Sequence, residues 1–571
     1  MLELPEREPA ESNGDITSEP ERVSHSAKHQ KRVFSEREPL LENGDNFLDP
    51  DDPRVSPLNL KRIKLLRTIL LAVLLFNTGL FLLVLVSDFI SIPGINPRGK
   101  SFLELDLVIF CILTGSITLW CFAVPAYYER LLGYFSCALV GLDVVVAISV
   151  PYLRDQFGLF GNMLMLWVLA NLILNCFADF WIEQGKAQQE IRFTGRIEKR
   201  KSLFEIFVTG IKIFVKFVLL VVIWNISLSL WLLAFDSHEK PWGKMVSVNE
   251  DQFKVHLACF GDVYAGANGT SDKPDDPSAP KQPIVLVEGG QQTSLEQFQE
   301  WIQELYHMNK IERYCIWDRP GFGFSDSAPS PTSIGIIVEY LMEALKKEGI
   351  EGPYSAVGFD VGGLYSKVFA LRNAGQMHSM LLVDSWHEDL LKHWPFSGPN
   401  KKNEKRKTFR DILDLMDSWQ GFKVWLRGVV SPLGFVRNIH WFFHPRSYLS
   451  KSRIFGTDMV RSPKYLRARL QEQITASILS YNEVHTADVG SISLSVILSQ
   501  FMIKKSLNWG KWQRELTKIS AKPLEWIVAE NSGHFIWESP KGRDNLQQLL
   551  LRLVSEKTNY MSEEGGKLAR V

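Results

Sequence analysis

The stretch that decides the fold of the second half of this chain reads Val357-Gly358-Phe359-Asp360-Val361-Gly362-Gly363. It follows the apolar run 354–357, which has the length and composition of a buried strand, and it precedes a helical pattern. Glycines flank the central position because a strand and a helix that meet in a tight turn pass too close for a Cβ atom. The sequence therefore predicts a strained strand-to-helix turn that lifts the side chain of Asp360 above a sheet.

Short β-rich runs alternate with helical patterns on both sides of this turn, which is typical of an α/β sheet. Residues 245–248 and 253–257 predict an opening antiparallel pair. Further runs are apolar on both faces, as in a parallel sheet covered by helices: 284–287, 314–317, 354–357, 380–383, 494–498 and 524–528. We expect a mostly parallel sheet with helices on both faces over residues 241–560.

Four ordered motifs resemble the α/β-hydrolase fold superfamily across roughly 246–556. They read Val287-Glu288-Gly289-Gly290, then 318–326 (Asp-Arg-Pro-Gly-Phe-Gly-Phe-Ser-Asp), then the turn at Asp360, then 382–389 (Leu-Val-Asp-Ser-Trp-His-Glu-Asp). The resemblance implies that His534 is the catalytic histidine and that the backbone N–H groups of Gly290 and Val361 form an oxyanion hole. It also implies a helical cap at about 390–488. The membrane region described below, joined to such a domain, resembles a group of uncharacterised fungal membrane proteins.

The nucleophile position holds Asp360 where most members of the superfamily have serine. Aspartate there resembles the epoxide-hydrolase and haloalkane-dehalogenase branches, in which a carboxylate attacks carbon and a His-activated water hydrolyses the resulting ester. The chain departs from these branches because Val361 replaces their usual tryptophan. The ring-opening tyrosines of an epoxide hydrolase can be placed by location only, at Tyr448, Tyr465 or Tyr481.

The acid that would orient His534 has more than one candidate. The usual position after the penultimate strand reads Ser499-Gln500-Phe501 and has no carboxylate nearby. Some members of the superfamily place the acid after the preceding strand, which nominates Asp384 and, as second choice, Glu388. Asp384 is equally well explained as a cap of the following helix. Because two of three triad positions are altered, the sequence also fits an inactive hydrolase-like module that binds a partner or a lipid.

Five apolar stretches within residues 61–240 reach the about 20 residues that a helix needs to cross a bilayer. They cover 68–90, 105–127, 132–152, 159–182 and 213–235. Lys212 and Lys216 at the start of the fifth are expected to snorkel to the interface. Asp143 lies inside the third stretch without an obvious charged partner, so transport by the spans is only a third hypothesis.

The basic residues of the connecting segments indicate the orientation of the spans. One cluster, 61–67, precedes the first span, and another, 186–201, follows the fourth. Both are predicted to be cytosolic, which delivers the α/β domain to the lumenal side. Asn268 begins an acceptor sequon in a polar loop of that domain and is predicted to be glycosylated.

Residues 1–60 and 561–571 are polar and are predicted to be disordered, the first as a cytosolic tail. Glu36-Arg37-Glu38-Pro39-Leu40-Leu41 resembles the acidic dileucine signal of endosomal and vacuolar membrane proteins, with Glu36, Leu40 and Leu41 as its key residues. A sorting adaptor is thus an expected partner, although a Glu-rich tail also produces this match by chance. The signal favours the vacuolar membrane over the endoplasmic reticulum and mitochondrial membranes.

Composition excludes several other functions. Lys+Arg and Asp+Glu both total 64, so there is no basic excess for nucleic acid. No dinucleotide fingerprint, P-loop or His-rich metal motif occurs, and we expect neither cofactor nor metal. Cys259 and Cys315 lack metal-ligand spacing. The cap region mixes aromatic with basic residues, as either a helix packed over the sheet or a lid resting on the bilayer would.

These inferences predict a membrane-anchored hydrolase, epoxide hydrolase-like or ester hydrolase-like, that acts on an apolar or lipid-derived substrate. The alternative is the inactive binding or scaffold module.

Overall fold

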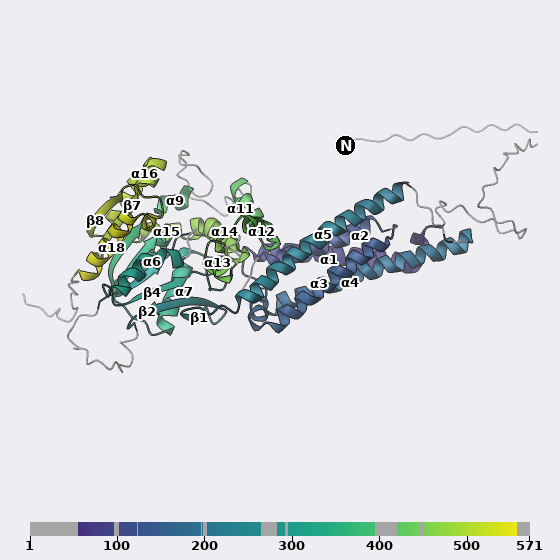
Figure 1. Ribbon diagram of the computed structural model, residues 1–571, viewed down its shortest axis with the longest axis horizontal. Helices are drawn as coiled ribbons and strands as arrows, with labels where there is room; N and C mark the ends of the chain where they lie inside the picture. Colours follow the sequence, from purple (N-terminus) through teal and green to yellow (C-terminus); the bar gives the residue numbers. More distant parts are fainter. Residues whose placement is uncertain are drawn as a thin grey trace, which may run out of the picture.

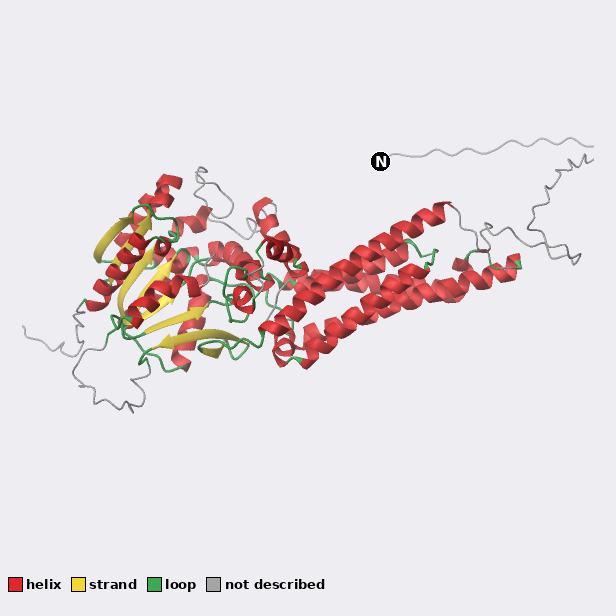
Figure 2. Ribbon diagram, in the orientation of Figure 1, coloured by secondary structure: helices red, strands yellow, loops and turns green. Residues whose placement is uncertain are grey.

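The computed structural model describes residues 55–95, 102–122, 124–195, 197, 203–263, 282–291, 295–393, 419–444 and 449–556. A helical bundle forms one end of the elongated molecule and an α/β domain the other (Figures 1 and 2). The predicted sorting signal (Glu36, Leu40, Leu41), the sequon at Asn268, residues 1–54 of the first predicted tail and the whole of the second lie outside the described residues. Residues 55–60 are described and hold a short 3₁₀ helix, Pro57–Asn59, with Val55 and Pro57 buried, so the prediction of disorder is wrong for them.

Five helices long and apolar enough to cross a membrane make up the bundle. They are α1 (Lys61–Ser87), α2 (Leu103–Trp120), α3 (Tyr127–Ser149), α4 (Pro151–Thr194) and α5 (Leu203–Asp236). Each contains most of one predicted span, so the prediction of five apolar helices is confirmed. The longest, α4, kinks at Gly158, whose φ of 59° is readily adopted only by glycine.

Lys212 and Lys216 do not snorkel, and that prediction is wrong. Lys212 Nζ lies 2.6 Å from Glu129 and 3.5 Å from Asp179, and Lys216 Nζ lies 2.9 and 3.5 Å from the same carboxylates. Because α3 and α4 bring two carboxylates to two lysines, the buried charges are paired inside the bundle. Asp143 instead accepts hydrogen bonds from Ser227 (2.5 Å) and from a tryptophan of α5 (2.9 Å).

The α/β domain is built on one eight-stranded sheet in the order β1-β2-β4-β3-β5-β6-β7-β8. β1 and β2 pair antiparallel, as predicted, and β3 to β8 are parallel to one another. The strands are β1 (Lys244–Val248), β2 (Phe253–Phe260), β3 (Ile284–Glu288), β4 (Tyr314–Asp318), β5 (Tyr354–Phe359), β6 (Met377–Val383), β7 (Ser493–Ser499) and β8 (Lys522–Ala529).

Helices cover both faces of the sheet because its strands are apolar on both sides (Figure 2). Leu286 and Ala356 pack on the face covered by α7 (Ile334–Lys347) and α8 (Gly362–Arg372). Their neighbours Val287 and Val357 pack on the opposite face, under α6 (Leu295–His307) and α18 (Pro540–Ser555). The predicted α/β architecture is thus confirmed.

A disulfide joins Cys259 on β2 to Cys315 on β4. The two residues lie directly opposite each other in the antiparallel register of these strands. They are 56 positions apart in the sequence, so spacing alone gave no sign of the bond.

The remaining helices of the domain are α9 (Glu388–His393), α11 (Trp419–Val430), α12 (Phe435–Phe443), α13 (Ser450–Ile454), α14 (Pro463–Leu479), α15 (Tyr481–Thr486), α16 (Gln500–Lys505) and α17 (Leu507–Leu516). α12 packs against the end of α5, not over the sheet as one of the two sequence interpretations expected. The carbonyl of Pro432, just before α12, accepts from Ser229 Oγ of α5 (2.7 Å), and within α12 the amide of Asn438 donates to Asn225 Oδ1 (3.0 Å).

α14 bridges the two ends of the molecule. Its Tyr465 hydroxyl donates to the carbonyl of Gln291 in the α/β domain (2.7 Å). Its Gln471 side chain donates to the carbonyl of Asp88, directly after α1 (2.5 Å), and Arg467 lies 3.7 Å from the Asp88 carboxylate. One cap helix therefore contacts both the sheet-end loops and the membrane bundle.

Candidate active site

The turn between β5 and α8 has the strained geometry that its sequence predicts. Asp360 has a φ of 54°, in the left-handed region. A Cβ on Gly358 would lie 2.7 Å from Gly363 Cα, and one on Gly362 would lie 2.5 Å from the carbonyl oxygen of Gly289. Only glycine fits at these positions, and the close packing holds the Asp360 side chain above the sheet.

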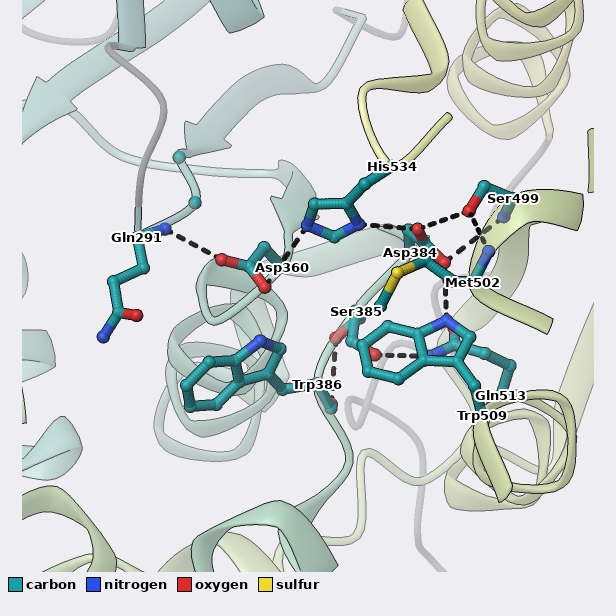
Figure 3. Close-up of polar contacts among 12 residues, drawn as sticks. Gln291, Asp360, Asp384, Ser385, Trp386, Ser499, Met502, Trp509, Gln513 and His534 are labelled. Atoms are coloured by element: carbon teal, nitrogen blue, oxygen red, sulfur yellow. Dashed lines mark hydrogen bonds and ion pairs between the residues drawn. The ribbon is translucent and has the colours of Figure 1, made fainter. Parts of the chain in front are cut away.

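Two kinds of group contact the Asp360 carboxylate (Figure 3). The backbone N–H of Gln291 donates to Oδ2 at 2.9 Å. The N–H of Val361 also donates to this carboxylate. On the other side, Oδ1 lies 3.5 Å from His534 Nε2. The carboxylate thus has one oxygen held by the backbone amide of Gln291 and the other directed at the imidazole.

The backbone donor predicted at Gly290 belongs to Gln291, one residue later. Gly290 instead packs against the turn, where a Cβ would lie 2.6 Å from the Phe359 ring. The guanidinium of Arg319 donates to the carbonyls of Gly289 (2.6 Å) and Gly290 (3.0 Å). Together with Tyr465 on Gln291 O, this contact fixes the loop that carries the Gln291 N–H.

Asp384, directly after β6, is the carboxylate that contacts His534. It is fully buried, has a φ of 42°, and its Oδ2 accepts from His534 Nδ1 at 2.7 Å. Ser499 donates to it through its hydroxyl (2.8 Å) and its N–H (3.2 Å), and Trp509 Nε1 donates at 2.6 Å. The second candidate, Glu388, lies 3.4 Å from Lys367 instead. Of the two acids left open by the sequence, the structure brings Asp384 to the imidazole.

The charges in this row of residues shift one another's protonation. Burial raises the pKa of Asp360, but the hydrogen bond and charge of His534 and the N–H groups of Gln291 and Val361 lower it further than burial raises it. Burial lowers the pKa of His534, but Asp360 and Asp384 outweigh it and raise this pKa to about 9. At neutral pH the site therefore rests with Asp360 ionised and His534 protonated.

Asp360 and His534 line a cavity of about 300 Å³. This volume is at the lower end of the about 300–1,000 Å³ typical of small-molecule sites. Most of its walls are apolar or aromatic, and Lys505 is the only lysine or arginine among the described residues that line it. The lining residues are Gln291, Phe359, Asp360, Trp386, Leu390, Phe501, Met502, Lys505, Trp509, His534 and Phe535.

None of the three candidate tyrosines is among the described residues that line this cavity. The Tyr465 hydroxyl is committed to the carbonyl of Gln291, and burial raises its pKa to about 12. Tyr481 stacks on His485. Tyr448 lies outside the described residues. The site thus presents no described tyrosine as a proton donor to an opening epoxide.

One group of side chains in the described part of the chain could hold a metal ion. His387, Asp389 and Glu515 each offer one ligand atom, and these atoms lie within 4.8 Å of one another. None of the three lines the cavity beside Asp360. The expectation that the protein uses no metal remains a prediction.

Ser499, Trp509, Gln291 and Lys505 were not foreseen as site residues. In the sequence, Ser499 marks only the position where a carboxylate is missing, although β7 pairs with β6 and so brings Ser499 beside Asp384. Trp509 and Lys505 lie on helices after β7, and an apolar helix pattern does not reveal which side chain faces a cavity. The pairing of neighbouring strands could have indicated Ser499, but not the other three.

Two family models match parts of this chain. Residues 36–259 match the model of a region of unknown function (DUF2417), and residues 282–418 match the model of the alpha/beta hydrolase fold. An uncharacterized protein of Schizosaccharomyces pombe is 24% identical over 524 residues, covering 86% of this chain and 90% of its own. Among solved structures, the Cif epoxide hydrolase from Acinetobacter nosocomialis is 15% identical, with a TM-score of 0.39, and covers 57% of this chain and 96% of its own.

The relative that decides the family comes from baker's yeast. An uncharacterized vacuolar membrane protein of Saccharomyces cerevisiae is 30% identical over 567 residues, covering 86% of each chain. The match therefore takes in both the helical bundle and the α/β domain. The chain belongs to the same family as this yeast vacuolar membrane protein, and it joins five apolar helices to an α/β-hydrolase domain.

Proposed function

We propose that this protein is a membrane-anchored hydrolase that uses Asp360 as nucleophile, His534 as the base for water, and Asp384 to orient His534. The single observation that carries the proposal is the row of contacts from Asp360 Oδ1 to His534 Nε2 (3.5 Å) and from His534 Nδ1 to Asp384 (2.7 Å), at the wall of an open cavity. Its apolar walls favour an apolar or lipid-derived substrate with a carbon–oxygen or carbon–halogen bond.

In the first step, Asp360 Oδ1 attacks a carbon atom of the substrate, because Oδ2 is held by the Gln291 N–H. A carbon–oxygen or carbon–halogen bond breaks, its electron pair stays on the leaving group, and an ester forms at Asp360. A halide leaves without a proton. An alkoxide takes a proton from the Lys505 ammonium in the cavity wall, and Lys505 regains it from solvent.

In the second step, the ester has lost the negative charge that raises the pKa of His534, so the imidazole releases its proton to solvent and becomes a base. Water gives a proton to His534 Nε2 and attacks the ester carbonyl carbon. The N–H groups of Gln291 and Val361 stabilise the oxyanion on Oδ2. When the intermediate collapses, the bond from the Asp360 carbonyl carbon to the product oxygen breaks. The product alkoxide takes the proton of the new hydroxyl on that carbon, and Asp360 is restored as a carboxylate with one solvent oxygen.

We place this domain on the lumenal side of the vacuolar membrane. The Cys259–Cys315 disulfide supports an oxidising compartment, and the basic segments around the spans support a cytosolic N-terminal side. We propose the vacuolar membrane because the yeast relative is named as a vacuolar membrane protein.

A second candidate is an inactive module in which the ionised Asp360 and protonated His534 form only a structural ion pair. The close contact between these groups at rest favours this alternative. The two candidates differ in whether Asp360 is ever esterified.

The experiment is turnover in ¹⁸O-labelled water with the full chain in phospholipid nanodiscs. The substrates are an aromatic epoxide, an epoxidised fatty acid, a bromoalkane and a p-nitrophenyl acyl ester. We expect the peptide that contains Asp360 to gain solvent oxygen with at least one of the first three, and His534→Gln to accumulate the alkyl ester there. Turnover with an unlabelled Asp360 would exclude this residue as nucleophile, and no reaction with any of the four would favour the inactive module.

A further inference from the structure

A second cavity, of about 270 Å³, lies where the membrane bundle meets the α/β domain. Leu230 and Leu233 of α5 and Leu103 of α2 line one side, and Met459 and Phe324 line the other. None of its described lining residues also lines the cavity beside Asp360. It is therefore a separate compartment at the lumenal end of the spans.

Charged side chains line this second cavity. They are four cations (Arg437, Arg453, Arg461 and Lys464) and three carboxylates (Asp236, Glu239 and Asp458), and the Asp326 carboxylate behind the wall accepts from Gln156 and attracts Lys464. Arg453 pairs with Asp236 (2.9 and 3.0 Å), and Arg461 pairs with Asp458 (2.9 Å). Lys464 donates to two backbone carbonyls, those of Gly323 and Ser325, at 2.8 Å.

Arg437 is the one of the three arginines in this cavity without a directly paired carboxylate among the described residues. Its guanidinium donates to Ser229 Oγ (3.0 Å) and lies 5.0 Å from the Trp441 ring. It forms no ion pair with a carboxylate of the described residues, and its Nε is buried without a hydrogen-bond partner among them. A guanidinium has five donors in a rigid fork that matches a carboxylate, and a buried donor without an acceptor is costly.

The surroundings of this cavity indicate where its ligand comes from. α12 carries Arg437 and is fixed to α5 at Ser229 and Asn225, about two and three turns before the end of that span. Most large apolar side chains of α12 are exposed, with Phe442 82% and Phe443 70% accessible. An amphipathic helix with exposed aromatics beside a membrane span is typical of an element that lies in the lipid interface.

We propose that the cavity between the spans and the cap binds a long-chain carboxylate of the lumenal leaflet, with the carboxylate on Arg437 and the acyl chain along Leu230, Leu233 and Met459. The Arg437 guanidinium, with its unpartnered Nε, fits an anionic head, and the leucines of the span wall fit an acyl chain. This site is additional to the proposed hydrolase site and does not use Asp360.

The test uses the full chain in phosphatidylcholine nanodiscs and a diazirine-labelled palmitate. We expect labelling of peptides from α5 and α12, and about tenfold weaker labelling by the matching diazirine alcohol, because the charged hydrogen bonds are lost. Arg437→Gln keeps a donor for Ser229 and should bring the palmitate down to the level of the alcohol. Arg437→Lys should restore part of the difference, and Leu233→Trp should reduce labelling by both probes.

Two comparisons make this test independent of the hydrolase proposal. Asp360→Asn should label as the wild type does, and free acetate should not displace the palmitate, since the site needs the chain as well as the head. Equal labelling by acid and alcohol, or labelling confined to peptides around Trp386 and Trp509, would overturn the inference. Because Arg437→Gln should leave labelling by the alcohol unchanged, a loss of both probes would indicate misfolding of this variant. The acid-to-alcohol ratio of the wild type would then decide the question alone.

Discussion

Two groups of buried charges, one at each end of the molecule, differ in their balance. In the membrane bundle, Lys212 and Lys216 face Glu129 and Asp179, two cations against two carboxylates. In the α/β domain, His534 is the one basic group between two carboxylates, and the site opens on a cavity. In a cluster with equal numbers of cations and carboxylates, each charge is neutralised by another. A carboxylate in excess beside a cavity, in contrast, can attack a substrate. Balance and access, not burial alone, separate a structural cluster from a reactive one.

The strongest test of this difference is to remove the carboxylate that is in excess at the active site, that of Asp360. Asp360→Ala leaves one carboxylate and one imidazole, and we expect turnover to fall by on the order of 10⁴-fold or more, as for a nucleophile of a triad. The melting temperature at neutral pH should fall only modestly, because the variant loses the stabilising ion pair of Asp360 with His534. Steady-state rates with the substrate found above and a thermal melt in detergent measure both.

A matched pair of variants separates the two acids near His534. Asp384→Asn should also remove most of the activity, while Glu388→Gln should leave it largely intact, since Glu388 pairs with Lys367. Similar losses in both variants would contradict the assignment of Asp384.

Substitutions in the membrane cluster should chiefly lower the stability of the protein, whereas substitutions at the active site should chiefly lower the rate of turnover. Lys212 is 1% exposed and Glu129 is not exposed, so Lys212→Met leaves two buried carboxylates with one cation. We expect a destabilisation of about 3–5 kcal/mol, the usual cost of breaking a buried pair. The half-exposed pair Lys186–Glu205 is the control, and Lys186→Met should cost less than about 1 kcal/mol.

The double variant Lys212→Met, Glu129→Leu restores the balance of charge and should recover much of the stability lost by Lys212→Met. Denaturation in mixed micelles, followed by tryptophan fluorescence, compares the three variants. A double variant no more stable than Lys212→Met would show that the lysine acts by packing and not by charge.

Removal of the Cys259–Cys315 disulfide should have a moderate effect on stability. The bond links β2 to β4 across 56 residues, and its loss should cost about 2–4 kcal/mol through the added freedom of the unfolded chain. Thermal melts with and without reductant should differ in the wild type and coincide in Cys259→Ala, Cys315→Ala. Mass spectrometry of the protein purified from its native membrane should find the bond. Two free thiols there would argue against the lumenal placement.

The strands were predictable because each central strand is apolar on both faces, a pattern that local sequence carries by itself. The turn at Asp360 was predictable because only glycines tolerate its close approaches. Contacts between residues that are distant in the sequence were not predictable. Lys212 lies at the start of an apolar stretch, where a lysine is expected to snorkel to the interface. Its partner Glu129 is on another helix, which the local sequence does not reveal. The choice between Gly290 and Gln291 as donor depends on how one loop bends.

The smallest expected effect concerns the protonation of His534, and it tests the excess of carboxylates directly. Burial lowers the pKa of His534, but Asp360 and Asp384 outweigh burial and raise this pKa from its ordinary value of 6.5 to about 9 in the fold. This ion-pair contribution to stability is fully present below about pH 6.5 and is lost as the pH rises through about 9. The melting temperature should therefore fall between pH 7 and pH 10, and fall less in Asp360→Asn. Diethylpyrocarbonate, which reacts with neutral imidazole, should modify His534 with a midpoint near pH 9 in the wild type and at lower pH in Asp360→Asn. The same midpoint in both proteins would mean that Asp360 does not hold the proton on His534, and the contrast between the two clusters would lose its electrostatic basis.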